Sequence, residues 1–361
     1  MLIGIDIRTV CRQKTGKGWY TYHLVRELLI ADKKNEYILY TDKLSGECAD
    51  FSSAHIQLIN GSGILWHLKV IKDFLDKKGA LFFAPTSYIV PALMPKKIKT
   101  VVMVHDLIAF LKISAHQNKA TIIEKLFLRF ALNKAEKILV PSESTKKDLI
   151  KKFGFLNKAK NKSRIFVTPE AAGDEFKIKP KNLNEVRKKY DLPEKFLLTV
   201  GGLQPRKNIS RLIDAVEDSK EKIQLVIVGD NGWNGEESVE KIAASKKILQ
   251  ITNCSSEDLI ALYHLATIFI FPSLYEGFGL PILEAMAAGC PVICSNSSSL
   301  PEVASDAAIM IDPLDTDKMR DAITNLWNNE KLRGELIKKG HTQTASFTWK
   351  KTAELTLKAF S

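Results

Sequence analysis

Long hydrophobic runs are absent from this sequence. The longest, around residues 266–274, is about half the ~18 residues that a membrane-spanning helix needs. The chain opens with Met-Leu-Ile-Gly-Ile-Asp-Ile, which is typical of a strand and lacks the basic start and the cleavage site of a secretory leader. We therefore expect no membrane-spanning helix and a cytoplasmic protein.

Cysteine is scarce, and its number is odd. No two of the five cysteines have the CxxC spacing of a redox or zinc site, and no cluster of His, Asp and Glu indicates another metal. We expect reduced, mostly packed cysteines and no metal. The five are Cys11, Cys48, Cys254, Cys290 and Cys294.

Acidic residues are sparse in the first half of the chain. Residues 1–180 hold 31 Lys and Arg against 17 Asp and Glu, a net charge of +14, and the remainder holds 22 against 24, in agreement with the overall +12. Such asymmetry predicts an anionic partner for the first half: nucleic acid, a phospholipid surface or a phosphorylated acceptor. We find no helix-turn-helix, finger or basic stretch interleaved with aromatic residues, which argues against nucleic acid.

A basic amphipathic helix is expected over residues 121–137. Two interpretations remain open for it: a helix that covers its domain and exposes a solvated basic face, or a surface that touches membrane or acceptor headgroups. The expected apolar face consists of Ile122, Leu126, Phe127, Phe130 and Ala131, and the cations elsewhere are Lys125, Arg129, Lys134 and Lys137.

Alternating strand and helix patterns are abundant. With 361 residues, 45% of them hydrophobic, the chain can fill two cores. Continuous apolar runs such as Thr100–Val104 are typical of parallel strands that are covered on both faces. The Lys- and Asn-rich stretch between residues 151 and 190 indicates a linker. The sequence thus predicts an α/β protein of two domains.

Residues 276–289, Glu-Gly-Phe-Gly-Leu-Pro-Ile-Leu-Glu-Ala-Met-Ala-Ala-Gly, have all the parts of an anion site. A strand over 266–271, a glycine-bearing loop and a helix starting near Pro281 would direct free backbone N–H groups and the positive end of a helix dipole at a phosphate. Gly279 lets a ligand approach the backbone closely. A lone Glu284 would be explained as a favourable acid near a helix start, but Glu276 in the loop favours a binding site.

A second glycine-bearing loop, Gly-Gly-Leu-Gln-Pro-Arg-Lys-Asn over residues 201–208, follows the strand expected at 196–200. Gly202 permits close approach of a ligand, and Arg206 and Lys207 stand just before a helix. Alone, such a pair is usually a solvated loop end. Together with the first motif it favours a phosphate site, since Arg offers bidentate donors and Lys a point charge.

The first half has two weaker candidates. Gly16 and Gly18 lie in a loop between a strand and a helix expected from Tyr22, but the third glycine of a dinucleotide fingerprint is missing. His105 stands at the end of a buried strand, the edge where open α/β sheets bind ligands, although a lone His is more often a satisfied core or surface residue.

The motif at 276–289, continued by Ser-Ser-Leu-Pro-Glu-Val at 298–303, closely resembles the signature of retaining glycosyltransferases of family 4, and His105 with Asp106 resembles mannosyltransferase-like members. The resemblance is close over residues 196–315 and loose over 1–170. It implies the GT-B fold, two Rossmann-like doubly wound parallel-sheet domains that face one another across a cleft.

Roles for single residues follow from the resemblance. It implies that Glu276 lies near the donor sugar, that Glu284 holds the ribose hydroxyls, and that the loop at Gly279 and Leu280 meets the diphosphate. The implied diphosphate clamp is Arg206 and Lys207, beside Gly202. Gly16, Gly18 and His105 would lie near donor and acceptor, although many relatives have Arg or a small residue in place of Trp19.

The implied reaction transfers a sugar, with mannose expected, from a nucleoside-diphosphate donor, with GDP-mannose expected, to a glycan or lipid-linked hydroxyl with retention. No metal or other cofactor is implied. The basic first domain is expected to face an anionic surface, which would make the protein peripheral at the inner face of the membrane. Alternatives are a GT-B sugar-nucleotide epimerase, a non-catalytic nucleotide-sugar-binding subunit and, disfavoured by the missing glycine, a Rossmann oxidoreductase.

Domain boundaries complete the expectation. Residues 1–172 would form the acceptor-side Rossmann-like domain, 173–195 a linker, and 196–345 the nucleotide-sugar-binding Rossmann-like domain. Residues 346–361 resemble the helix that in this fold crosses back to the first domain.

Overall fold

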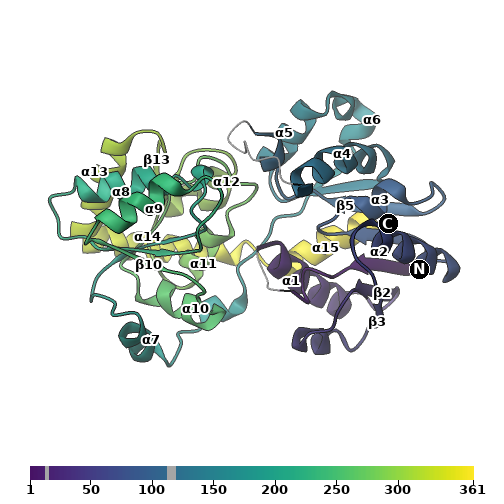
Figure 1. The fold of residues 1–361 in the computed structure, drawn as a ribbon, viewed down its shortest axis with the longest axis horizontal. Coiled ribbons are helices and arrows are strands. Elements are labelled where there is room, and N and C mark those ends of the chain that lie inside the picture. Colours follow the sequence, from purple (N-terminus) through teal and green to yellow (C-terminus); the bar gives the residue numbers. More distant parts are fainter. Residues whose placement is uncertain (13–15, 112–118) are drawn as a thin grey trace. The chain divides into compact units, whose positions relative to one another are not determined.

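The computed structural model describes residues 1–12, 16–111 and 119–361, which divide into two compact units (Figure 1). The first unit comprises Met1–Glu170 and Thr348–Ser361, and the second comprises Ala171–Phe347. Within the described residues, no helix combines the length and the hydrophobicity of a transmembrane span.

A parallel sheet of seven described strands, in the order β3-β2-β1-β4-β5-β6-β7, forms the centre of the first unit. Its strands are β1 (Leu2–Asp6), β2 (Glu36–Thr41), β3 (His55–Leu58), β4 (Leu81–Ala84), β5 (Lys99–Met103), β6 (Lys137–Val140) and β7 (Ile165–Val167). The helices are α1 (Gly16–Ala31), η1 (Gly46–Phe51), α2 (Gly63–Asp76), α3 (Ile89–Leu93), η2 (Ile108–Phe110), α4 (Lys119–Lys134), α5 (Glu143–Lys152), η3 (Gly154–Asn157), α6 (Ala159–Lys162) and α15 (Trp349–Phe360).

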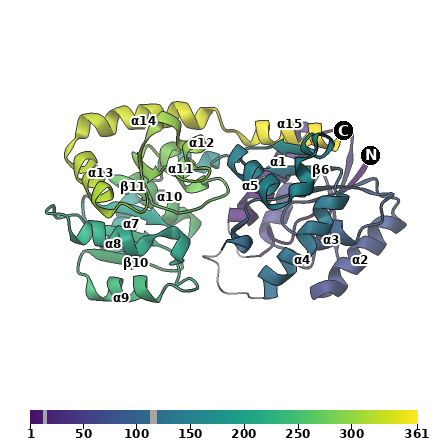
Figure 2. The ribbon, with the colours of Figure 1, turned by 90° about the horizontal axis from the view of Figure 1, so that it is seen from above.

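Helices cover both faces of this sheet, as the pleat of β4 shows. Phe82 packs against Phe74 of α2, with ring centroids 5.4 Å apart, and the next residue, Phe83, packs against Phe360 of α15 at 5.5 Å. Because successive side chains of a strand point to opposite faces, α2 and α15 lie on opposite sides of the sheet. The helix α1 packs against α15, whereas α2 and α4 both pack against α3 (Figure 2).

The second unit is built on a parallel sheet with the described order β10-β9-β8-β11-β12-β13. The strands are β8 (Leu197–Val200), β9 (Leu225–Val228), β10 (Ile248–Ile251), β11 (Ile268–Phe271), β12 (Val292–Ser295) and β13 (Ala308–Ile311). The helices are η4 (Asp174–Lys177), α7 (Leu183–Lys189), η5 (Pro205–Lys207), α8 (Ile209–Glu217), α9 (Glu236–Ala244), α10 (Ser256–Leu265), α11 (Leu280–Ala287), α12 (Leu300–Ala304), η6 (Ser305–Ala307), α13 (Thr316–Asn328) and α14 (Glu330–Ala345).

The structure corrects the prediction of a linker over residues 173–195. These residues belong to the second unit, where α7 packs on α10 and η4 packs on α11. Val186 and Leu192 are buried in its core. The Lys and Asn residues that suggested a linker lie on the outside of short helices whose few apolar side chains point inward, and this arrangement leaves little periodicity in the sequence.

Candidate active site

The order of strands in the second sheet fixes where a ligand is expected. After β8 the chain moves outward to β9 and β10 on one side, and after β11 it moves outward to β12 and β13 on the other. The carboxyl ends of β8 and β11 therefore flank a topological switch point, where open α/β sheets bind their ligands. Both motifs singled out in the second half of the sequence begin at these two strand ends.

A buried cluster of three charged side chains joins the two loops. Glu276 Oε1 accepts hydrogen bonds from Arg206 Nη1 at 2.7 Å and from Lys207 Nζ at 2.6 Å. The side chains of Arg206, Lys207 and Glu276 are only 15%, 11% and 12% exposed. The structure thus brings together three of the predicted site residues, although 69 residues of sequence separate Lys207 from Glu276.

The charged groups of this cluster shift one another's pKa values. Burial alone would raise the pKa of Glu276, but Lys207 and Arg206 outweigh it, so that the pKa lies below its ordinary value. Burial lowers the pKa of Lys207, and Arg206 lowers it further against the opposing effect of Glu276. With all three groups ionised the cluster keeps one net positive charge, which suits a polyanionic ligand.

Asn208 holds the first loop in place, a role that sequence reasoning missed. Its backbone is left-handed, with φ of 60°. Its Nδ2 donates to the carbonyl oxygens of Pro272 at 3.2 Å and Pro313 at 2.6 Å, so that the loop after β8 is tied to the chain after β11 and to the chain after β13. An Asn directly before a helix is the available signal, because Asn adopts the left-handed region more readily than most residues.

Substitution of Asn208 by Ala should cost about 2–4 kcal/mol in unfolding free energy, since two buried carbonyl groups lose their partner and Ala disfavours a positive φ. Urea denaturation measures this loss. The exposed Asn328, which donates to Glu221, provides the matched Asn328→Ala control, for which we expect less than about 1 kcal/mol. Equal stability of the two variants would contradict the bridging role.

The second loop is held by serines. Ser298 Oγ accepts from the backbone N–H of Glu276 at 3.0 Å, and Ser299 Oγ lies 3.0 Å from the Glu276 carbonyl oxygen and 2.6 Å from that of Phe278. Both serines belong to the signature quoted above, but their task as supports of the loop was not predicted. They fix the backbone from which the Glu276 carboxylate reaches the two cations.

Gly279 marks the turn into α11. Its φ of 122° is accessible to glycine alone, and a Cβ there would lie 2.7 Å from Leu300 Cδ2. The helix begins at Leu280, with Pro281 in its first turn as predicted. At Gly202, the group that closely approaches the backbone is the protein's own Asp230. A Cβ at position 202 would lie 3.3 Å from the carbonyl oxygen of Asp230.

Glu284 lies one turn into α11 and is partly buried. Its Oε2 accepts from Tyr263 OH at 2.8 Å, and this tyrosine of α10 is fully buried. Burial raises the pKa of Glu284 to about 7, with Glu175 adding to the rise and with Tyr263 and Lys207 opposing it. Tyr263 was not predicted, because its partner lies on another helix and no sequence spacing links the two.

The raised pKa of Glu284 predicts a pH-dependent stability. In the folded protein the Glu284 carboxyl group keeps its proton up to a pKa of about 7, whereas in the unfolded chain it loses the proton at its lower, ordinary pKa. This difference stabilises the folded protein fully below the unfolded pKa, and the stabilisation is lost as the pH rises to about 7. We expect a loss of up to about 3 kcal/mol from this group. Urea denaturation at several pH values should give a flatter profile for Glu284→Gln, whereas Glu335→Gln, at an exposed position, should retain the wild-type slope. Parallel profiles for all three proteins would contradict the assignment.

His105, in the first unit, is buried and engaged on both sides of its ring. Nε2 lies 2.9 Å from the carbonyl oxygen of Pro85, and Nδ1 lies 3.1 Å from Oε1 of the equally buried Glu170. Since the carbonyl only accepts, the ring donates to it from Nε2, and Nδ1 faces the Glu170 carboxyl group. Tyr20 packs edge-on against the ring, with centroids 4.6 Å apart. Glu170 lay in the stretch interpreted as approaching a linker and was missed.

The glycines of the first half do not form the predicted loop. α1 begins at Gly16, so that Gly16 and Gly18 lie in its first turn, ahead of the expected start at Tyr22. Lys17 Nζ between them lies 4.0 Å from Asp106 Oδ2. Thr15, which directly precedes Gly16 and was also expected in this loop, lies outside the described residues.

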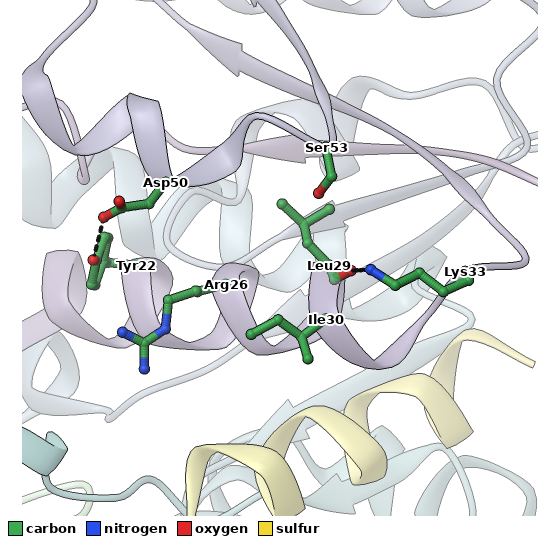
Figure 3. Close-up of a pocket in the computed structure, with 7 residues that line it drawn as sticks. All are labelled: Tyr22, Arg26, Leu29, Ile30, Lys33, Asp50 and Ser53. Atoms are coloured by element: carbon green, nitrogen blue, oxygen red, sulfur yellow. Dashed lines mark hydrogen bonds between the residues drawn. The ribbon is translucent and has the colours of Figure 1, made fainter.

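A cavity of about 330 Å³ lies along α1 (Figure 3). In Figure 3 the hydroxyl of Tyr22 reaches Asp50, and Lys33 Nζ donates to the carbonyl oxygen of Leu29 at 2.7 Å. The lining residues are Tyr22, Arg26, Leu29, Ile30, Lys33, Asp50 and Ser53. None of them is a predicted site residue, so the cavity is separate from the candidate site.

Comparison with known proteins gives the family. A model described as "Glycosyl transferases group 1" matches residues 182–343, and one described as "Glycosyltransferase Family 4" matches residues 80–167, so that together they cover more than half of the chain. The O-antigen chain mannosyltransferase B of Escherichia coli is 28% identical, with 96% of each chain covered. The serotype-specific mannosyltransferase WbdA of Escherichia coli is 30% identical over 73% of this chain, which spans only 33% of that protein.

A solved structure supports the fold independently. The crystal structure of HepE from Anabaena in complex with UDP-glucose superimposes with a TM-score of 0.79 at 14% identity. The match covers 100% of this chain and 99% of HepE, so the two proteins share the fold. Two doubly wound parallel-sheet units, with charged loops at a switch point, are the expected features of such proteins. The chain therefore belongs to the family-4 glycosyltransferases, enzymes of the GT-B fold, and resembles the mannosyltransferases among them.

Proposed function

We propose that this glycosyltransferase transfers mannose from GDP-mannose to a hydroxyl group of a glycan or lipid-linked acceptor, with retention at the anomeric carbon. The cluster of Arg206, Lys207 and Glu276 at the β8/β11 switch point is the observation that carries the proposal. The choice of mannose and of a glycan acceptor rests on the names of the O-antigen mannosyltransferases to which the chain is similar.

The proposed chemistry follows from where charge develops. When the bond between the sugar and the diphosphate breaks, the leaving group gains negative charge, and Arg206, Lys207 and the N-terminus of α11 stabilise it. We propose that these groups supply the positive charge that a cation supplies in other enzymes, and that no metal or other cofactor is needed. Glu276, held beside both cations, would face the sugar, and Glu284 would accept hydrogen bonds from the ribose hydroxyls. We favour a front-face reaction without a covalent intermediate.

Thermal-shift measurements with GDP-, UDP-, ADP- and dTDP-sugars test the donor. A ligand at about one hundred times its Kd adds about 2.7 kcal/mol, so GDP-mannose should raise the Tm clearly above the other sugars. Incubation of GDP-mannose with acceptor, followed by NMR of the new glycosidic bond, tests transfer and retention. A preference for another donor, or an inverted product, would refute the corresponding part of the proposal.

The same assays separate the alternatives. A sugar-nucleotide epimerase would convert the donor without acceptor, and a non-catalytic subunit would bind donor and transfer nothing. The three charged residues of the cluster favour an active transferase, because a subunit that only held nucleotide would not require a carboxylate between the two cations.

We also propose that the enzyme works peripherally at the inner, cytoplasmic face of a membrane. The net charge of +14 over residues 1–180 supports this placement, since each Lys or Arg near an anionic surface contributes on the order of 1 kcal/mol.

A further inference from the structure

Tyr263 of α10 is enclosed on all sides within the second unit, and it has no exposed surface. Its ring packs edge-on against Phe176 of η4 and Phe269 of β11, with centroids 5.7 Å and 5.3 Å apart. A buried tyrosine hydroxyl usually has a hydrogen-bond partner, and here the partner is Glu284 Oε2 at 2.8 Å. The two aromatic neighbours therefore fix the position from which the hydroxyl reaches the carboxyl group.

The hydroxyl of Tyr263 remains a donor at every ordinary pH. Burial raises the pKa of Tyr263 well above its ordinary value, and the charge of Glu284 raises it further. The phenol therefore keeps its proton. Since an ionised carboxylate only accepts, the hydrogen bond runs from Tyr263 to Glu284.

The other carboxyl oxygen of Glu284 is left for a ligand. Among the residues that the structure describes, none forms a hydrogen bond with Glu284 Oε1. The side chain is partly exposed, and it lies one turn into the helix that begins after Gly279. An ionised carboxylate has about four acceptor positions, of which Tyr263 takes one. Two neighbouring hydroxyl groups of a ligand can therefore still donate to Glu284.

Three side chains besides burial act on the charge of this carboxyl group. Burial has the largest effect and raises the pKa of Glu284. Tyr263 lowers it through its hydrogen bond and Lys207 of η5 through its charge, whereas Glu175 of η4 raises it. The helices α12 and α14 and the strands β11 and β12 also pack on α11, but in this unit, described throughout, none of their side chains shifts the pKa of Glu284. Tyr263 is thus the group that most strongly opposes protonation of Glu284.

We propose that Tyr263 is a positioning residue of the donor site, which holds Glu284 oriented and ionised so that it accepts hydrogen bonds from the two ribose hydroxyl groups of the nucleotide. The inference rests on the ribose contact proposed for Glu284. Because Tyr263 has no exposed surface, it does not itself touch the nucleotide. A protonated carboxyl group would be a weaker acceptor and would turn one of its oxygens into a donor. Without Tyr263, Glu284 would also lose the bond that fixes its orientation.

Calorimetric titration of the full chain with GDP tests the inference. Tyr263→Phe keeps the ring between Phe176 and Phe269 and removes only the hydroxyl group. We expect its Kd for GDP at neutral pH to rise by about five- to twentyfold, since the ribose contact loses the hydrogen bond that supports it. In steady-state kinetics the KM for the donor should rise by a similar factor. The kcat at saturating donor should stay within about twofold of wild type, because the lost interaction concerns the nucleotide and not the reacting sugar.

The pH profile of GDP binding is a readout that a loss of packing would not move. Since the ionised carboxyl group is the better acceptor, wild-type affinity should rise as the pH passes about 7 and then level off. In Tyr263→Phe the midpoint should lie at higher pH, because the hydrogen bond that lowers the pKa of Glu284 is missing. A terminal phosphate also titrates at a pH of about 6, so each profile is compared with that of Glu284→Gln, to which this carboxyl group contributes nothing.

Tyr40→Phe is the matched control. Tyr40 is also fully buried, and its hydroxyl donates to the Asp73 carboxylate at 2.9 Å, but in the first unit. This variant should lose about as much stability as Tyr263→Phe, with GDP affinity and pH profile like those of wild type. Circular dichroism should show both variants folded.

Three outcomes would overturn the inference alone. Tyr263→Phe could bind GDP like wild type although Glu284→Ala does not, Tyr40→Phe could weaken GDP equally, or kcat could fall in Tyr263→Phe as much as KM rises. Unchanged GDP affinity in Glu284→Ala is a different result. It would overturn the ribose contact in the proposed function, and the role of Tyr263 with it.

Discussion

Replacement of Arg206 or Lys207 by Ala should lower kcat/KM by about ten- to a few hundredfold, with the fold intact. Charge-assisted hydrogen bonds contribute roughly 1.5–3 kcal/mol each, and both cations lie at the switch point where the diphosphate of the donor is expected. Steady-state kinetics with varied donor measures the loss. Lys222→Ala, which removes an exposed cation of the same unit, is the control and should have wild-type kinetics.

The shared partner of the two cations sharpens this prediction. Because both donate to the same oxygen of Glu276, each single variant leaves the other cation paired, whereas the double variant leaves a buried carboxylate without a partner. The two losses should therefore not be additive, and the double variant should also lose stability. Near-normal turnover in both single variants would remove Arg206 and Lys207 from the proposed clamp.

Replacement of Glu276 by Ala should lower kcat by about a hundred- to a thousandfold, the range for removal of an electrostatic group aimed at a transition state. Affinity for free GDP should stay unchanged or increase, since Glu276 no longer competes with the diphosphate for Arg206 and Lys207. Glu276→Gln, which keeps the shape but not the charge, should also lose most of its activity.

Calorimetric titration of free GDP separates Glu276 from Glu284. Glu284→Ala should chiefly weaken the nucleotide, because the proposed ribose contact is lost, whereas Glu276→Ala should spare it. An equal loss of GDP affinity in both variants would contradict this division of roles.

Much of the second unit could be predicted from sequence, because its signals are local. The strand at Ile268–Phe271, the glycine turn at Gly279 and the helix from Leu280 follow one another within a short stretch, so propensity and spacing locate them. The pairing of Lys207 with Glu276 is a different matter. It depends on β8 and β11 being neighbours in the sheet, and strand order is set by long-range packing that no local pattern encodes.

What the sequence left open or missed elsewhere has the same physical origin. Ile122 and Phe130 share a helical spacing with residues that do pack, and only the placement of α4 on the sheet decides which apolar side faces inward. Glu170 looked like part of an approach to a linker, yet it is the buried partner of His105 across 65 residues of sequence. Periodicity indicates that a side is apolar but not what covers it.

The path of the chain between the two units has a consequence for synthesis on the ribosome. The second unit is continuous in sequence, whereas the first is completed only by α15, whose Trp349, Ala353 and Phe360 are buried against it. Although domains generally fold in the order in which they emerge, here the N-terminal sheet must wait with part of one face uncovered until residues 348–361 are translated. A stop codon shortly before Thr348 would therefore leave the second unit complete and the first prone to aggregation, even though every strand of both sheets had been made.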